Sequence, residues 1–278
     1  MFLVSKIKQI IKFYFFGNSS FNNFWEYLSK ISLKGMNYGE HSIHSSGEAW
    51  FLKEFNNHFS NQDLLFFDVG ANIGLWTSEV VKYLNSSSTV HCFEPFSLNY
   101  DILEQKFTQD SRIKLNNLGL SKENQDSEIY TVARDTGMTS LYQRKLEHFG
   151  YEMENTETVT LITLDDYCVK NKIDWIDYLK MDVEGHEYDV LKGSKNMLES
   201  KKIGIIQHEF GGCNIDSRTF FQDFWYFLNK NYHIYRLLKN GLKKIKQYEE
   251  EQERFLTSTF LSVLKNYKKN MFVNDLQI

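Results

Sequence analysis

The segment 64–84 constrains the fold of this chain more than any other part of the sequence. An apolar run ends at Asp68, and a short loop with Gly70 and Gly74 then leads into a helix-like stretch. A strand, a small-residue loop and a helix begin a mononucleotide-binding βαβ unit. In such a unit the glycines let the backbone approach a ligand, and the helix N-terminus offers free N–H groups to it. The segment therefore predicts an α/β fold with a ligand at this loop.

A second carboxylate stands at the sequence distance that a ribose-binding residue has in such units. The apolar run 89–93 ends at Glu94, twenty residues after Gly74, and a carboxylate there can accept hydrogen bonds from both ribose hydroxyls. The loop reads Gly70-x-Asn72-x-Gly74, which lacks the third glycine of a pyrophosphate loop, and the P-loop pattern is also absent. These residues predict a ligand of the adenosine type rather than a dinucleotide.

Two motifs resemble those of the FkbM family of S-adenosylmethionine-dependent methyltransferases. The loop 68–74, Asp-Val-Gly-Ala-Asn-Ile-Gly, has the form of motif I that this family uses. The segment 179–187, Leu-Lys-Met-Asp-Val-Glu-Gly-His-Glu, is followed by Val-Leu-Lys-Gly at 190–193. Together these two stretches look like the signature of the family at the fourth strand of its sheet.

The resemblance covers most of the chain, from about Gly47 to about Lys265, and the first 45 residues are less typical. It implies a Rossmann-like class I methyltransferase fold, with a mainly parallel seven-stranded sheet and an antiparallel last strand. It also implies S-adenosyl-L-methionine as the cofactor. The residues expected to bind that cofactor lie in the loops and strand ends: Asp68, Gly70, Asn72, Gly74, Glu94, Asn117 and Asp182.

Alternating strand-like and helix-like segments predict the same mainly parallel sheet. Strands are expected at 64–68, 89–94, 112–117, 127–132, 159–164, 178–182, 203–209, 232–239 and 258–264, and helices at 73–84, 97–107, 188–199 and 218–230. The polar excursion 133–158 is expected to hold a loop at Gly137 and a helix near 141–148, and the charged run 247–254 looks like a solvated helix. The Asn240-Gly241 turn predicts a hairpin that places an antiparallel strand at the sheet edge. Residues 1–60 are expected to form a helical N-terminal extension packed on the core, and 61–270 the cofactor-binding domain.

Acidic residues end several of these strands, where ligands bind in open α/β sheets. Asp182 and Glu209 end neighbouring strands and are expected to face the transferred methyl group. Transfer of a methyl group from a sulfonium to an oxygen needs an aligned acceptor and a base that removes its proton. The candidate bases are Asp182, Glu184, Glu209, His186 and His208, and the carboxylates are preferred because a lone strand-end histidine is more often structural.

A divalent metal is the alternative to a metal-free base. Asp182, Glu184 and Glu209 offer oxygen ligands suited to Mg²⁺ or Mn²⁺, which would bind substrate hydroxyls and lower their pKa. The sequence does not separate the two mechanisms.

Composition agrees with a single soluble enzyme domain that has no general attraction to nucleic acid. Hydrophobic residues make up 42% and aromatic residues 16% of the chain, and the formal net charge is −4. The three cysteines lie far apart with no CxxC pattern, which predicts reduced thiols and a cytoplasmic protein.

The first sixteen residues follow a basic amphipathic pattern. Leu3, Ile7, Ile10 and Tyr14 fall on one helical face, but lysines interrupt the apolar positions, so neither a membrane span nor a signal peptide is expected. A helix docked on its own domain is the preferred interpretation, and contact of residues 1–16 with an anionic membrane surface is the alternative. The oligomeric state stays open.

The resemblance implies O-methylation of a hydroxyl group, on sugars or polyketide-type products. The Asn- and Lys-rich composition is typical of an AT-rich bacterial genome, and by analogy alone favours a surface polysaccharide such as a capsule, or its nucleotide-sugar precursor. Two other functions stay open. An NAD-dependent sugar oxidoreductase would bind NAD more tightly than S-adenosylhomocysteine and would need a Tyr-x-x-x-Lys pair, which we do not find near the relevant strands. A catalytically inactive binding protein of the same fold would be unaffected by substitution of Asp182 and Glu209.

Overall fold

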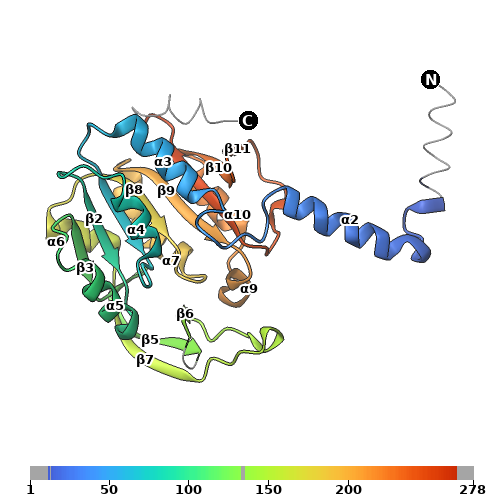
Figure 1. The fold of residues 1–278 in the computed structure, drawn as a ribbon, viewed down its shortest axis with the longest axis horizontal. Coiled ribbons are helices and arrows are strands. Elements are labelled where there is room, and N and C mark those ends of the chain that lie inside the picture. The colour runs from blue at the N-terminus through green and yellow to red at the C-terminus, as the bar shows by residue number, and fades with distance from the viewer. Residues whose placement is uncertain (1–11, 13, 133–134, 268–278) are drawn as a thin grey trace.

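Five neighbouring parallel strands make up one side of an eight-stranded sheet in the computed structural model, which describes residues 12, 14–132 and 135–267 (Figure 1). The order across the sheet is β11-β10-β12-β9-β8-β1-β2-β3. The strands are β1 (Leu65–Val69), β2 (Thr89–Phe93), β3 (Ile113–Asn116), β8 (Ile176–Met181), β9 (Ile203–Phe210), β10 (Tyr232–Leu238), β11 (Gly241–Ile245) and β12 (Ser258–Leu264). The last strand, β12, pairs antiparallel with β9 and with β10, so the expected seven-stranded arrangement is present with β11 added at its edge.

Helices cover both faces of this sheet, which explains why its central strands read as continuous apolar runs. Phe66 and Tyr178 lie on one face and contact α3 (Glu48–Phe59) and α4 (Leu75–Val81) through Phe55 and Trp76. Phe67 lies on the other face and contacts α6 (Leu164–Asn171) through Tyr167. The remaining helices are α5 (Ser97–Phe107), α7 (Glu187–Lys192), α8 (Lys195–Glu199), α9 (Cys213–Ser217) and α10 (Phe221–Leu228).

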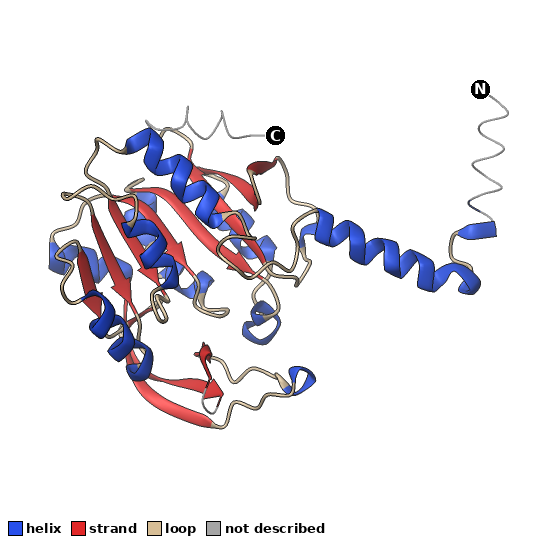
Figure 2. Ribbon diagram, in the orientation of Figure 1, coloured by secondary structure: helices blue, strands red, loops and turns tan. Residues whose placement is uncertain are grey.

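The strands expected at 127–132 and 159–164 belong to a second, four-stranded sheet, which is separate from the main sheet and was not predicted as such. Its order is β4-β7-β5-β6, with β4 (Gly119–Leu120), β5 (Gln125–Val132), β6 (Asp135–Ser140) and β7 (Asn155–Ile162). In Figure 1, β5, β6 and β7 lie below the lower ends of the main strands, and Figure 2 shows the same arrangement. This sheet therefore supplies a second wall opposite the strand ends.

The polar excursion 133–158 differs from its prediction in two ways. Gly137 lies within strand β6 instead of a loop, and in place of a helix at 141–148 the described chain has only a short 3₁₀ turn, Glu147–Phe149. Tertiary contacts decide this conformation, because Leu146 packs with Val132 and Met153. Helical periodicity in so short a segment is a weak signal against such contacts.

Three other elements differ from their predicted bounds. The helix expected at 188–199 is divided into α7 and α8, and the helix expected at 218–230 is shortened to α10. In the charged run 247–254 only the 3₁₀ turn Glu250–Gln252 is helical. The hairpin predicted at Asn240-Gly241 joins β10 to β11, whereas β12, the antiparallel partner of β9, lies inside the sheet rather than at its edge.

The two N-terminal helices differ in their packing. Helix α3 buries Phe51, Leu52, Phe55 and Phe59, whereas α2 (Asn22–Gly35) buries none of its residues and projects from the body of the molecule (Figure 1). The helix expected over residues 3–14 falls almost entirely outside the described residues. Among the described residues, no helix has the length and apolar character that a membrane crossing requires.

Candidate functional site

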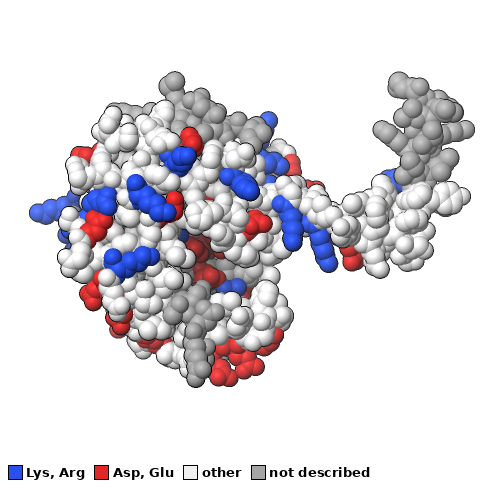
Figure 3. All heavy atoms as spheres, in the orientation of Figure 1, with Lys and Arg blue, Asp and Glu red and all other residues white. Residues whose placement is uncertain are grey.

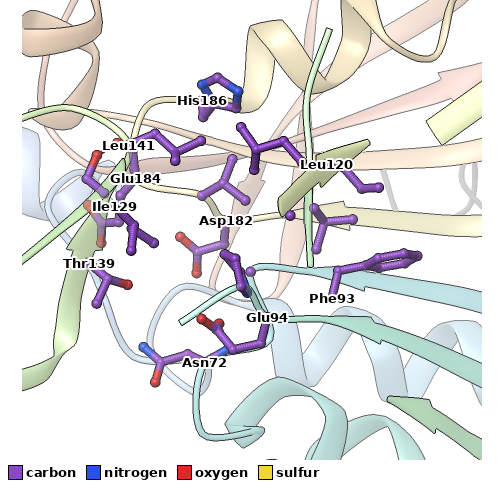
Figure 4. Close-up of a pocket in the computed structure, with 17 residues that line it drawn as sticks. Asn72, Phe93, Glu94, Leu120, Ile129, Thr139, Leu141, Asp182, Glu184 and His186 are labelled. Carbon is purple, nitrogen blue, oxygen red and sulfur yellow. Dashed lines mark hydrogen bonds between the residues drawn. The ribbon is translucent and has the colours of Figure 1, made fainter. Parts of the chain in front are cut away.

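A cavity opens between the carboxyl ends of the central strands and the second sheet. Six of the predicted site residues line it: Gly70, Asn72, Glu94, Asp182, Glu184 and His186. Apolar side chains from both sheets complete its wall, among them Phe93, Leu120 and Ile129 (Figure 4). An apolar wall with a few converging polar groups is the usual form of a small-molecule site.

The loop after β1 has a backbone that few side chains tolerate. Gly70 has a φ of 76° and Asn72 a φ of 47°, both in the left-handed region. A Cβ atom on Gly70 would collide with the carbonyl oxygen of Asp182, so this glycine lets the ends of β1 and β8 approach each other. Gly74 follows at the N-cap of α4.

Glu94 holds the loop from the end of β2. Its Oε2 accepts a hydrogen bond from the backbone N–H of Asn72 at 2.7 Å, and its Oε1 accepts one from the N–H of Phe96 at 3.0 Å. Burial raises the pKa of Glu94 to about 7 against the lowering effect of these two bonds. Asn117 is not a lining residue; its Nδ2 donates to the carbonyl oxygens of Glu94 and Pro95 and fixes the backbone there.

Asp68 does not face the cavity, which corrects its expected role as a cofactor contact. Its side chain is completely buried, where Lys180 Nζ donates to one carboxylate oxygen at 2.9 Å and Thr77 Oγ1 to the other at 2.6 Å. Strand register places Asp68 beside Lys180, and Lys180 Nζ also donates to the carbonyl oxygen of Gly70 at 3.2 Å. Asp68 and Lys180 thus form a charged layer beneath the loop.

Asp182 is the most accessible acid at the site. Its side chain is 45% exposed, lies 3.7 Å from Lys180 Nζ and lines the cavity. In Figure 4 its carboxylate lies near that of Glu94, so the two strand ends converge.

Glu184 is held by an ion pair from the second wall. Its carboxylate pairs with Arg144, and its backbone carbonyl oxygen accepts a hydrogen bond from Ser140 Oγ at 2.9 Å. The backbone of Glu184 is in the left-handed region, with a φ of 51°. Arg144 also lies 3.6 Å from Asp216. Burial and the charge of Asp182 raise the pKa of Glu184 to about 7, despite the opposing charge of Arg144.

The two candidate histidines are enclosed by neighbouring side chains, as structural residues are. His186 lines the cavity, but its ring nitrogens bond to the hydroxyls of Ser121 and Tyr142 at 2.9 and 3.1 Å, and burial lowers its pKa to about 4. His208 is fully buried between Phe224 and Phe260, and neither ring nitrogen has a hydrogen-bond partner among the described residues. Because burial lowers its pKa to about 3 and its ring lies on the α10 face, His208 is removed from the candidate bases.

Glu209 belongs to a group of partly buried acids outside the cavity lining. Burial and then the charges of Asp182, Glu184 and Glu48 raise its pKa well above the usual range. Glu48, at the start of α3, accepts a hydrogen bond from Ser46 Oγ at 2.9 Å and one from Gln207. Burial raises the pKa of Glu48 as well.

The expected metal ligands do not form a cation site in the described part of the chain. No group of three histidine, cysteine or acidic side chains there is arranged to hold a metal ion. Glu184 is paired with Arg144, and Glu209 lies outside the cavity lining. The mechanism proposed below therefore assigns no role to a metal ion.

Several residues that bind and orient the site residues were not among the sequence predictions. They are Lys180, Thr77, Arg144, Glu187 and Glu48. A lysine within an apolar strand was a usable signal, because a buried charge requires a partner. No comparable signal pointed to Arg144, because its contact with Glu184 depends on how the chain folds after strand β6 of the second sheet.

The strand order, with its antiparallel β12, and the cavity at the strand ends define a Rossmann-like α/β protein of the methyltransferase type. Residues 68–239, more than half of the chain, match the methyltransferase FkbM domain. The chain therefore belongs to the FkbM methyltransferase family, and the resemblance seen in the sequence is confirmed.

Individual relatives are distant. The hexuronic acid methyltransferase AglP of Haloferax volcanii is 26% identical over 182 residues, which are 61% of this chain and 70% of AglP. Among solved structures, an O-methyltransferase from Bacillus cereus in complex with SAH has a TM-score of 0.45 at 9% identity, covering 94% of this chain and 97% of that one. A putative O-methyltransferase from Klebsiella pneumoniae also has a TM-score of 0.45 at 9% identity, covering 92% and 94%.

Proposed function

We propose that this protein transfers the methyl group of S-adenosylmethionine to a hydroxyl oxygen of a sugar. One observation carries the proposal: a single cavity is lined by the loop residues Gly70 and Asn72, by Glu94 and by Asp182. The first three suit an adenosyl ligand, because Gly70 permits close backbone approach and each Glu94 oxygen keeps a free lone pair beside its bond from the backbone. The apolar wall of Phe93 and Leu120 suits an adenine ring.

The bound cofactor would supply a methyl group already activated by the sulfonium charge. The chain would then position the acceptor hydroxyl in line with that methyl group and take its proton. Asp182 is the proposed base, since it is accessible and lines the cavity, and general-base assistance contributes roughly 10²–10⁴-fold in rate. We assign Glu184 and His186, which are bound to Arg144, Ser121 and Tyr142, to positioning the acceptor.

The sugar acceptor is supported by the likeness to AglP, named for hexuronic acid methylation. A surface polysaccharide or its nucleotide-sugar precursor remains the proposed substrate class. The cytoplasm is the proposed compartment, supported by three free, buried thiols at Cys92, Cys168 and Cys213.

Two measurements test this proposal. In calorimetry, we expect S-adenosylhomocysteine to bind at least about tenfold more tightly than NAD, a difference of about 1.4 kcal/mol. Tighter binding of NAD would instead support the oxidoreductase alternative. In cells, mass spectrometry should show that deleting the gene removes one CH₂ unit per modified sugar from the surface glycans.

The Asp182→Asn variant separates catalysis from binding. We expect it to leave the glycans unmethylated in the deletion strain while it keeps its affinity for S-adenosylhomocysteine within a few-fold. As a matched control, Glu123→Gln on the exposed surface should restore methylation fully. Full restoration by Asp182→Asn would contradict the assigned base, and unchanged glycans after gene deletion would contradict a glycan acceptor.

A further inference from the structure

Helix α2 exposes a continuous apolar face. Phe24, Tyr27, Leu28 and Ile31 follow the helical spacing i, i+3, i+4, i+7, and their exposed fractions are 52, 63, 38 and 49%. None of the fourteen residues of α2 is buried. Soluble monomers rarely leave such contiguous patches open, so this face calls for a binding partner.

The aromatic segment before α2 extends this face. Tyr14, Phe15 and Phe16 are 60, 41 and 53% exposed. The segment folds back onto the helix, because Trp25 Nε1 donates to the carbonyl oxygen of Phe15 at 2.9 Å and the rings of Phe16 and Trp25 meet edge to face at 5.1 Å. Residues 14–31, which we call the α2 arm, therefore carry exposed apolar side chains both on α2 and on the segment packed against it.

Basic residues outnumber acidic ones in this part of the sequence, where Glu26 is the one acid. Residues 1–35 contain five of the 32 Lys and Arg residues but only one of the 36 Asp and Glu residues, so the rest of the chain carries all of the net negative charge. Lys30 and Lys34 are exposed and one helical turn apart, beside Tyr27 and Ile31. Figure 3 shows the projecting arm as mostly uncharged, with basic side chains where it joins the body.

We propose that the α2 arm binds in the plane of an anionic phospholipid surface. An interfacial helix has aromatic and aliphatic residues on one face and lysines at its margin, whose stems extend along the apolar surface while their charges reach the lipid headgroups. Anionic lipid headgroups would neutralise Lys30 and Lys34, and this charge complementarity is the reason for choosing a lipid surface as the partner. The acidic body is repelled by the same surface, so only the arm is drawn to it.

Flotation of the full-length protein with vesicles tests the proposal. We expect the protein to float with vesicles of phosphatidylcholine and phosphatidylglycerol, to bind pure phosphatidylcholine at least about tenfold more weakly, and to be released by salt. The double variant Leu28→Asp, Ile31→Asp should lose at least about tenfold in partitioning onto the anionic vesicles. The variant Lys30→Gln, Lys34→Gln should weaken binding to anionic vesicles only.

The matched control is Ser29→Asp, which adds an acid to the opposite face of α2 and should retain most of the binding. Since all of these positions are exposed, each variant should keep the S-adenosylhomocysteine affinity of the wild type, which verifies folding independently. Failure of the wild type to float with anionic vesicles at low salt would overturn the proposal. A stable dimer in light scattering that Leu28→Asp, Ile31→Asp dissociates, without vesicle binding, would also overturn it and assign the arm to self-association.

Discussion

At the residue scale, the charged layer beneath the cavity depends on Lys180 and Asp68. Burial alone would lower the pKa of Lys180, but the charges of Asp68 and Asp182 and the hydrogen bond to Asp68 raise it, so the lysine stays charged. A buried ion pair contributes little net stability, but removal of one partner leaves the other as an uncompensated charge. The pair is therefore best understood as fixing the loop geometry, since Lys180 also binds the carbonyl oxygen of Gly70.

Substitution of Lys180 by Met should be strongly destabilising. We expect the free energy of unfolding, measured with urea, to fall by about 3–5 kcal/mol, because Asp68 is left buried and unpaired. The double variant Asp68→Asn, Lys180→Met should recover at least half of that loss, since it removes both charges. As a control, Lys53→Met on the exposed side of α3 should change stability by less than about 0.5 kcal/mol. A loss below about 1 kcal/mol for Lys180→Met would refute the role of this pair.

At the element scale, the loop between β1 and α4 needs glycine at position 70 for two reasons: its backbone is in the left-handed region, and there is no space for a side chain. Gly70 and Gly150 have nearly the same φ, 76° and 78°, but differ in their surroundings. A Cβ on Gly70 would meet the backbone of Asp182, whereas a Cβ on Gly150 would meet nothing within 4 Å. The two glycines therefore separate backbone strain from steric contact.

We expect Gly150→Ala to cost about 1 kcal/mol, the strain of a left-handed alanine, and to leave cofactor binding unchanged. Gly70→Ala should cost several kcal/mol more and should abolish measurable binding of S-adenosylhomocysteine, because the strand ends must separate. Thermal unfolding and calorimetry on both variants measure these effects. Equal losses for the two variants would show that the close approach to Asp182 is unimportant.

At the scale of the whole molecule, buried acids and buried histidines give stability opposite dependences on pH. Burial raises the pKa of Glu187 to about 8 and that of Glu94 to about 7, so the folded state holds these protons more tightly than the unfolded state. Their stabilisation is complete below the unfolded carboxyl pKa of about 4.3 and is lost as pH rises through 7 to 8. The buried histidines His186 and His208 act in the other direction, but only below their unfolded pKa of about 6.5.

Above pH 6.5 the acids therefore act alone. We expect the free energy of unfolding to decrease between pH 6.5 and 8, on the order of 1–3 kcal/mol, since each pKa unit corresponds to about 1.4 kcal/mol. Glu187→Gln should reduce this slope, because Gln cannot ionise. Urea titrations at three pH values in this range provide the test, and a stability that is constant or rises with pH would be inconsistent with the buried acids.

Much of the fold could be predicted because the decisive signals are local. The helix 97–107 and the strand 258–264 have their predicted bounds, since apolar periodicity and flanking polar residues specify them within a short window. The second sheet could not be predicted in the same way. Its strands are partly polar, and their pairing depends on contacts between residues far apart in the chain, such as Ser127 with Val159.

The candidate site shows the same division. Strand ends were identifiable, so Glu94 and Asp182 were correctly placed at one edge of the sheet. Successive side chains of a strand point to opposite faces of the sheet, so the adjacent residues His208 and Glu209 have different surroundings. His208 lies on the α10 face and is buried between aromatic rings, whereas Glu209 lies on the other face, with the other acids. Asp68 and Asp182 are both acids at the carboxyl ends of strands, but only the packing of Lys180 and Thr77 against Asp68 withdraws it from the cavity.

The amino-acid sequence by itself determined the family, the positions of the central strands and the loop that approaches a ligand, because these depend on residues close together in the chain. The tertiary structure alone decided which acids remain accessible, where Arg144 pairs, and that α2 stands apart from the body with its apolar face exposed. The physical reason is burial: the charge state and the availability of a side chain depend on the atoms packed around it, and those come from distant parts of the chain.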